Sequence, residues 1–138
     1  GIRGLIVTGV QTCALPIFYR HILELCGTDS AEDFAVVYTP LHGSGLRTAQ
    51  NVFPAAGFKR FYVVEAQKLP DGDFPTVNTP NPEDPTAMQM AIDMAKSVGA
   101  EIAIGTDPDA DRMGAAIRRE DGSFTMLTGN QIGCILTD

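Results

Sequence analysis

The residues of this chain that are best suited to chemistry lie in the run GTDPDADRMG, residues 105–114. The run places three carboxylates at alternate positions, Asp107, Asp109 and Asp111, and follows them with Arg112. Two negative charges about 4 Å apart repel one another by roughly 1 kcal/mol in water and about 4 kcal/mol near a protein surface. A hard divalent cation relieves this repulsion, and Mg²⁺ keeps coordination positions for water or a phosphate oxygen. The run therefore predicts an open magnesium site.

Two other structures also contain aspartates at this spacing. An EF-hand loop requires glycine at its sixth position and glutamate at its twelfth, where this chain has Arg112 and Arg118, so we reject it. A polar surface turn is the other alternative, because Gly, Asp and Pro are frequent in turns. The apolar strand predicted directly before the run favours a functional loop.

The pattern of apolar residues predicts an α/β protein in which strands alternate with helical segments. The helix at residues 84–98 is the most convincing, because its apolar residues recur on one face, Asp84 can cap it and Pro85 suits its first turn. The sequence Glu120-Asp121-Gly122 indicates a hairpin between the last two strands. We expect a three-layer α/β/α domain with a mostly parallel sheet and an antiparallel hairpin. The predicted strands are residues 34–39, 61–64, 100–105, 114–119 and 123–127, and the predicted helices are residues 18–26, 46–56, 84–98 and 130–137.

A second candidate segment is the sequence HGSG, residues 42–45, which follows the predicted strand 34–39. In open α/β sheets, ligands gather beyond the carboxyl ends of the strands, and both this segment and the aspartate run occupy such a position. His42 could hydrogen-bond to a substrate or transfer a proton, although stabilising the turn is the more common role. Gly43 and Gly45 suggest backbone freedom or close approach.

Composition limits the classes of function. The length of 138 residues suits one core, and the formal net charge of −7 argues against a general nucleic-acid binder. Three cysteines at unrelated spacings, Cys13, Cys26 and Cys134, predict free thiols in a reducing compartment, so we expect a cytoplasmic protein. No apolar run approaches the roughly 20 residues that span a bilayer, so no membrane partner is expected.

Four motifs together resemble a known family. They are TPLHGSGLRTA at residues 39–49, DGDFPTVNTPNPEDP at 71–85, GTDPDADRMG at 105–114 and LTGNQIG at 127–133. In this order they resemble the second domain of the α-D-phosphohexomutases, in particular the bacterial phosphoglucomutase and phosphomannomutase branch. The resemblance covers residues 34–138, and its specificity comes from the order of the motifs.

The resemblance implies an isomerase with four domains around a cleft. A phosphoserine in the first domain donates its phosphoryl group to a hexose phosphate and reclaims one from a bisphosphorylated intermediate, which moves phosphate between the 1- and 6-positions. The implied Mg²⁺ ligands here are Asp107, Asp109 and Asp111, with the phosphoserine as another ligand. Arg112 matches the family arginine beside the metal and is the first candidate catalytic residue, with His42 as the second. For Arg112, the alternative is an ion pair that only steadies the aspartates.

The chain also departs from the family pattern. It has no T-A-S-H-N-P-like loop with an acceptor serine, no G-E-E-S-G-like sugar loop and no C-terminal phosphate-binding domain. We therefore expect that the chain alone is inactive and that it derives from a longer, active enzyme. We divide it into a remnant of a preceding region, residues 1–33, with a helix at 18–27 and a connection at 28–33, and a metal-binding domain, residues 34–138. Residues 6–17 look like translated sequencing-adapter sequence, so we hypothesise that residues 1–17 are an artefact.

Two competing functions come from different classes. A nucleotide-sugar transferase can use a D-x-D motif to hold Mn²⁺ and a diphosphate, but Arg112 and the HGSG and LTGNQIG motifs favour the mutase. A metal-stabilised α/β module without catalytic function is the other alternative. That module would bind metal no more tightly when a phosphosugar or phosphopeptide is present.

Overall fold

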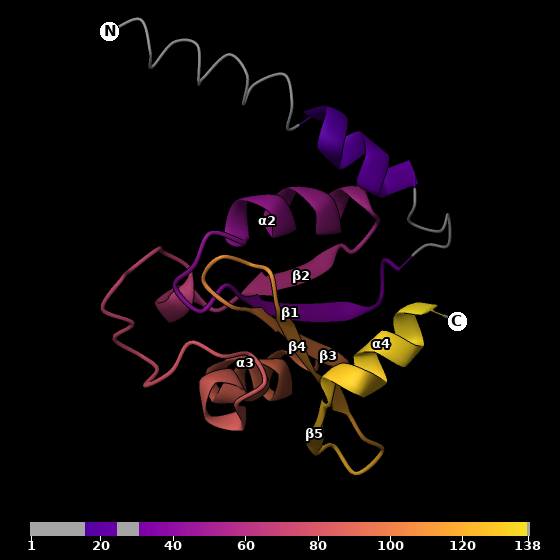
Figure 1. Cartoon of the computed structure of the whole chain (residues 1–138). Coiled ribbons are helices and arrows are strands. Elements are labelled where there is room, and N and C mark those ends of the chain that lie inside the picture. Colours follow the sequence, from indigo (N-terminus) through magenta and orange to yellow (C-terminus); the bar gives the residue numbers. More distant parts are fainter. Residues whose placement is uncertain (1–15, 25–30, 138) are drawn as a thin grey trace, which may run out of the picture.

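The computed structural model describes residues 16–24 and 31–137, which form a five-stranded sheet with helices on both faces (Figure 1). Strand β1 runs parallel to β2 and to β3, whereas β4 is antiparallel to both β3 and β5. The expected α/β/α architecture is confirmed, and the antiparallel half of the sheet includes the β3–β4 pair as well as the predicted hairpin. In sheet order the strands are β2 (Arg60–Val63), β1 (Ala35–Thr39), β3 (Ile102–Thr106), β4 (Met113–Arg118) and β5 (Phe124–Leu127).

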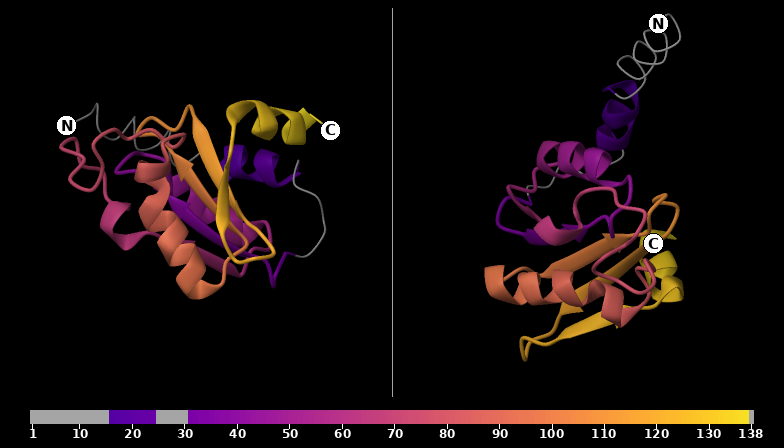
Figure 2. Two further views of the ribbon diagram at one scale, coloured as in Figure 1. Left: turned by 90° about the horizontal axis from the view of Figure 1, so that it is seen from below. Right: turned by 90° about the vertical axis from the view of Figure 1, so that its left-hand side faces the viewer.

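Two helices cover opposite faces of the sheet. Helix α2 (Leu46–Ala55) lies over one face and packs against β2, and α3 (Pro85–Val98) lies under the other and packs against β1 and β3 (Figures 1 and 2). Helix α4 (Gly129–Thr137) contacts β4, and residues 16–24 are also helical. All four predicted helices are present, within the residues described. The short 3-10 helix η1 (Glu65–Gln67) was not predicted, because three residues are too few to show a period.

Helix α3 forms for the reasons that its sequence suggests. The Asp84 carboxylate caps it by accepting a hydrogen bond from the Thr86 N–H at 2.8 Å, and Pro85 occupies the first turn. Gly99 ends the helix in the left-handed conformation, with φ of 67°. The face turned to the sheet is fully apolar and supplies much of the core. Its buried residues are Ala87, Met88, Ala91, Ile92 and Ala95.

The register of the parallel strands brings two loops to one edge of the sheet. Thr39, the last residue of β1, pairs with Gly105 near the end of β3. The chain leaves β1 into residues 40–45, which we name the β1–α2 turn, and leaves β3 into residues 107–112, which we name the aspartate loop. The two candidate segments are therefore neighbours, as their predicted position at the carboxyl ends of the strands requires.

Some predictions about the N-terminal region and the cysteines concern residues outside those that the structure describes. Residues 1–15 lie outside the described residues, so the adapter hypothesis stays untested, as does the end of the first helix beyond residue 24. Cys134 is an exposed free thiol, while Cys13 and Cys26 are outside the described residues. Within residues 16–24 and 31–137, no helix has both the length and the apolar character that crossing a membrane would require.

Candidate metal centre

The aspartate loop joins two antiparallel neighbours, β3 and β4, and is therefore itself a hairpin connection. The Asp107 N–H donates to the Arg112 carbonyl at 3.3 Å, and the Ala110 N–H donates to the Asp107 carbonyl at 3.0 Å. Ala110 has a φ of 60°, in the left-handed region that residues with a side chain seldom enter. These bonds make the loop a tight, fixed turn.

Asp107 is the buried carboxylate of the loop, with 1% of its surface exposed. Arg112 binds both of its oxygens: the backbone N–H donates to Oδ1 at 3.1 Å and Nε donates to Oδ2 at 2.9 Å. Burial alone would raise the pKa of the Asp107 carboxyl, but the two hydrogen bonds and the positive charge of Arg112 hold it below its ordinary value. Asp107 is therefore kept ionised at the bottom of the loop.

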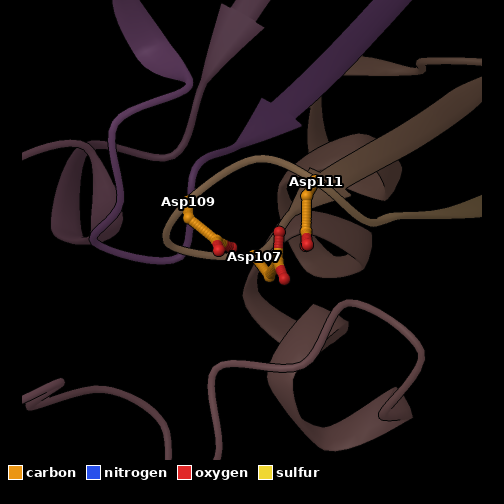
Figure 3. Close-up of side chains that lie close together, drawn as sticks. All are labelled: Asp107, Asp109 and Asp111. Carbon is orange, nitrogen blue, oxygen red and sulfur yellow. The ribbon is translucent and has the colours of Figure 1, made fainter.

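Asp109 and Asp111 are exposed and extend from the loop toward Asp107 (Figure 3). One carboxylate oxygen from each of the three aspartates lies within 4.8 Å of the others. The pKa of Asp111 is raised, because its carboxyl shares a hydrogen bond with that of Asp107 and because Asp109 and Asp107 add negative charge. The cluster therefore favours a bound positive charge, which a proton or a cation can supply.

The three carboxylates fit a hard divalent cation by their chemistry and nearly by their spacing. Two oxygens bound to one Mg²⁺ at 2.0–2.1 Å are at most about 4.2 Å apart. The oxygens of the cluster lie within 4.8 Å of one another, so the two exposed side chains would have to bring theirs closer together to share one ion. Three ligands leave half of an octahedron for water or a phosphate oxygen.

Arg112 combines the two roles that the sequence leaves open. Its Nε holds Asp107 and lies 3.7 Å from an oxygen of Asp111, so it does steady the aspartates. Yet 59% of the side chain is exposed, and within residues 16–24 and 31–137 no hydrogen bond engages its two terminal nitrogens. Those nitrogens are placed beside the cluster, where they can bind a phosphate oxygen.

His42 does not belong to the aspartate cluster and is 6% exposed. Its Nδ1 lies 3.2 Å from the Leu69 carbonyl oxygen and its Nε2 lies 2.8 Å from the Thr76 hydroxyl. Both ring nitrogens therefore have protein partners, which agrees with the role of stabilising the turn. To act on a substrate, Nε2 would first have to release Thr76, so a catalytic His42 stays a prediction without support from this geometry.

Sequence reasoning missed the residues that bind His42 and the end of β1. Gln67 is fully buried: its Nε2 donates to the Thr76 hydroxyl at 3.1 Å, and its Oε1 accepts from the Thr39 hydroxyl at 2.7 Å. A lone glutamine after a strand carries no sequence signal for burial. Thr76 lies within the DGDFPTVNTPNPEDP motif, and that motif was the available signal.

Comparisons with known proteins decide the family. Residues 17–122 match the family model described as "Phosphoglucomutase/phosphomannomutase, alpha/beta/alpha domain II". The chain belongs to the phosphoglucomutase/phosphomannomutase family. The matched region contains the aspartate loop and the β1–α2 turn, so the predicted family is confirmed. Three of the four motifs lie within it, and LTGNQIG at residues 127–133 follows it.

Individual relatives agree with this assignment. A phosphoglucomutase of Staphylococcus epidermidis is 38% identical over 119 residues, and one of Staphylococcus aureus is 40% identical over 119 residues. Each match covers 86% of this chain but 22% of the relative, so the chain spans about a fifth of the length of these relatives. A crystal structure of a phosphoglucomutase/phosphomannomutase family protein from Burkholderia thailandensis superposes with a TM-score of 0.61 at 26% identity, over 80% of this chain and 22% of that one. The two staphylococcal relatives are mutases by name, and this chain matches one part of them.

Proposed function

We propose that this chain is the metal-binding domain of a phosphosugar mutase, an isomerase that moves a phosphoryl group between the 1- and 6-positions of a hexose phosphate. The observation that carries the proposal is the aspartate loop, in which Arg112 fixes one buried carboxylate while two exposed ones converge on it. The family match separates this function from that of a nucleotide-sugar transferase, because the matched model describes the second domain of a mutase.

In the proposed site, Asp107, Asp109 and Asp111 hold Mg²⁺ through carboxylate oxygens. When bound, the ion neutralises charge on the phosphoryl group during transfer. Asp107 contributes a ligand that needs no reorganisation, because Arg112 already fixes both of its oxygens. Asp109 and Asp111 are exposed, so their side chains would be free to adjust to a bound ion.

Arg112 contributes a permanent positive charge at the edge of the cluster. Its terminal nitrogens offer donors suited to the oxygens of a phosphate group, and such preorganised donors stabilise charge that develops in the transition state. The proposed phosphate belongs to a phosphoserine loop elsewhere in the enzyme, which would also bind the ion. Arg112 would therefore orient the same phosphoryl group that the aspartates bind through Mg²⁺.

Among the described residues, the cavity beside the aspartate loop does not offer the other groups that a mutase requires. A cavity of about 550 Å³ lies beside Asp109 and is lined mainly by apolar side chains, including Phe53, Ile104 and Met113. This lining brings no positive charge for the second phosphate of a sugar. We therefore propose that the phosphoserine and the sugar-binding groups come from the rest of a longer enzyme and that this chain alone is inactive.

Calorimetry tests the proposal. Mg²⁺ and Mn²⁺ are titrated into the chain with and without a phosphoserine peptide, beside an Asp109→Asn/Asp111→Asn variant that keeps the buried carboxylate. We expect binding that needs the aspartates and becomes tighter with the phosphopeptide. Metal affinity that is the same with and without the phosphopeptide would favour the metal-stabilised module. Efficient conversion of glucose 1-phosphate by the chain alone would contradict the proposed inactivity.

A further inference from the structure

His42 fastens the β1–α2 turn to the segment that follows β2. Its backbone N–H donates to the Gln67 carbonyl at 2.9 Å, and its carbonyl accepts from the Asp71 N–H at 3.1 Å. Its ring lies between the Leu69 carbonyl and the Thr76 hydroxyl, at 3.2 and 2.8 Å. All the polar groups of His42 thus bind one segment, residues 67–76.

The hydrogen bonds around the ring have a single consistent direction. A carbonyl can only accept, so Nδ1 carries the hydrogen that points to Leu69, and in a neutral ring Nε2 then accepts from the Thr76 hydroxyl. The Thr76 oxygen in turn accepts from Nε2 of Gln67, whose Oε1 accepts from the Thr39 hydroxyl. Donors and acceptors match at each step from the end of β1 to Leu69, so removal of one hydroxyl leaves two partners unsatisfied.

The other side of the β1–α2 turn lies directly against the aspartate loop. The Ser44 N–H and hydroxyl both donate to the Pro108 carbonyl, at 2.8 and 3.1 Å. A Cβ built on Gly43 would lie only 2.3 Å from the Pro108 Cα, so the two backbones are in contact. Pro108 lies between Asp107 and Asp109, and a shift of the turn therefore moves the aspartates relative to one another.

The path of the turn is strained and requires support from the surrounding structure. Leu41 and His42 follow one another with φ of 45° and 62°, both in the left-handed region. Residues with a side chain remain there only where the surrounding structure fixes them, and such residues concentrate at functional sites. The bonds made by His42 supply that support.

We propose that His42 is a positioning residue of the metal centre: together with Thr76 and Gln67 it holds the β1–α2 turn against Pro108 and so sets where Asp109 lies relative to Asp107. The metal part of this inference rests on the proposed function. The mechanical part, the link from Thr76 through His42 to the aspartate loop, does not.

The test compares Thr76→Val, which removes the hydroxyl at nearly constant shape, with Thr76→Ser, which keeps it. Thr79→Val is the matched control, because Thr79 is an exposed threonine of the same connection. His42→Asn is a second route to the same loss: asparagine tolerates the left-handed region and can still donate toward Leu69, but it is too short to accept from Thr76. Amide hydrogen exchange is measured by NMR at Ser44 and at Arg119, whose amide bonds to Ser123 in the distant β4–β5 hairpin, and Mg²⁺ affinity is measured by calorimetry.

We expect Thr76→Val and His42→Asn to accelerate exchange at Ser44 about tenfold and to weaken Mg²⁺ binding about fivefold, with Arg119 unchanged. Thr76→Ser and Thr79→Val should behave as the wild type. Equal acceleration at Ser44 and Arg119 would mean general destabilisation and would overturn the proposal, as would unchanged exchange at Ser44. If the wild-type chain binds no Mg²⁺, the proposed function fails and the metal part of this proposal fails with it, while selective loosening of Ser44 would still support the link.

Discussion

Arg112 uses its Nε to hold Asp107 and has its two terminal nitrogens available for a phosphate. A conservative substitution separates these two roles. Lysine keeps the positive charge but cannot hold Asp107 and present a second pair of donors at the same time. For Arg112→Lys we expect Mg²⁺ affinity to stay within about threefold, while the tightening caused by a phosphoserine peptide falls about tenfold. Calorimetry with and without the peptide measures both. Arg118→Lys, at an exposed residue of β4, is the control; an undiminished peptide effect in Arg112→Lys would show that Arg112 only steadies the aspartates.

Tyr38 makes a contribution to stability that is lost at alkaline pH. It is 2% exposed, and its hydroxyl bonds to that of Thr106 at 2.7 Å. Burial raises the pKa of its phenol above the ordinary value of 10.0, despite the opposing effect of the Thr106 hydrogen bond. Because the folded state prefers the neutral phenol, this contribution is fully present below the unfolded pKa, and it is lost as pH rises from about 10 through the higher folded value.

Tyr38→Phe tests this contribution. At pH 8 we expect the variant to be less stable by about 1 kcal/mol, because the hydrogen bond to Thr106 is lost. Above pH 10 the difference in unfolding free energy between the two proteins should shrink, since only the wild type has at this position a phenol whose ionisation favours the unfolded state. Urea denaturation at a series of pH values measures the difference. Because the chain has three tyrosines, the difference in alkaline absorbance between the wild type and the variant reports the Tyr38 phenol. A difference that stays constant up to pH 11 would contradict the raised pKa.

The candidate site shows what residue types and spacing can predict. The alternating carboxylates and the arginine indicate the cluster because their chemistry is local. The division between one buried aspartate and two exposed ones depends on how β3 and β4 pair, and the sequence does not show that the aspartate loop is a hairpin connection. Gln67 was missed for a similar reason, because its partners Thr39 and Thr76 are separated from it in sequence and meet it only in the fold.

At the scale of elements, glycine fixes the contact between β4 and the connection that precedes α3. A Cβ built on Gly114 would lie 1.9 Å from the Pro82 carbonyl oxygen and 2.6 Å from its carbon, and both atoms belong to backbone. Gly114→Ala therefore cannot be accommodated without moving one of the two segments, and we expect it to lower the free energy of unfolding by about 2 kcal/mol or more. Gly72→Ala, which meets nothing within 4 Å, is the matched control and should be nearly neutral. Thermal or urea denaturation measures the stability of both variants. Equal stability would show that the two segments move apart at little cost in free energy.

The elements themselves were largely predictable because their signals are periodic. The buried face of α3 and the alternation of strands with helices follow directly from where the apolar residues fall. The sheet order β2-β1-β3-β4-β5 could not be predicted from the sequence, because the pairing of strands depends on contacts between residues that are far apart in the chain. The antiparallel β3–β4 pair is the clearest example: the apolar strand 100–105 and the strand 114–119 were recognised, yet their direction relative to one another was not.

At the scale of the whole molecule, Mg²⁺ binding at the aspartate loop should raise the free energy of unfolding of the chain. A ligand that binds only the folded state adds stability that grows with the logarithm of its concentration, about 2.7 kcal/mol at a hundredfold excess over its Kd. We therefore expect the unfolding free energy of the chain to rise with Mg²⁺ when ionic strength is held constant with NaCl, which corrects for simple screening. Urea denaturation across a magnesium series measures the effect.

The Asp109→Asn/Asp111→Asn variant shows whether that effect comes from the cluster. It removes two of three crowded negative charges but leaves Asp107 in its bonds to Arg112, so without metal it should be at least as stable as the wild type. With metal it should gain nothing, and the two stability curves should therefore diverge as Mg²⁺ is added. Parallel curves would mean that Mg²⁺ stabilises the chain elsewhere. Lower stability of the variant without metal would mean that the exposed aspartates stabilise the loop in the absence of a cation, and that their mutual repulsion does not favour cation binding.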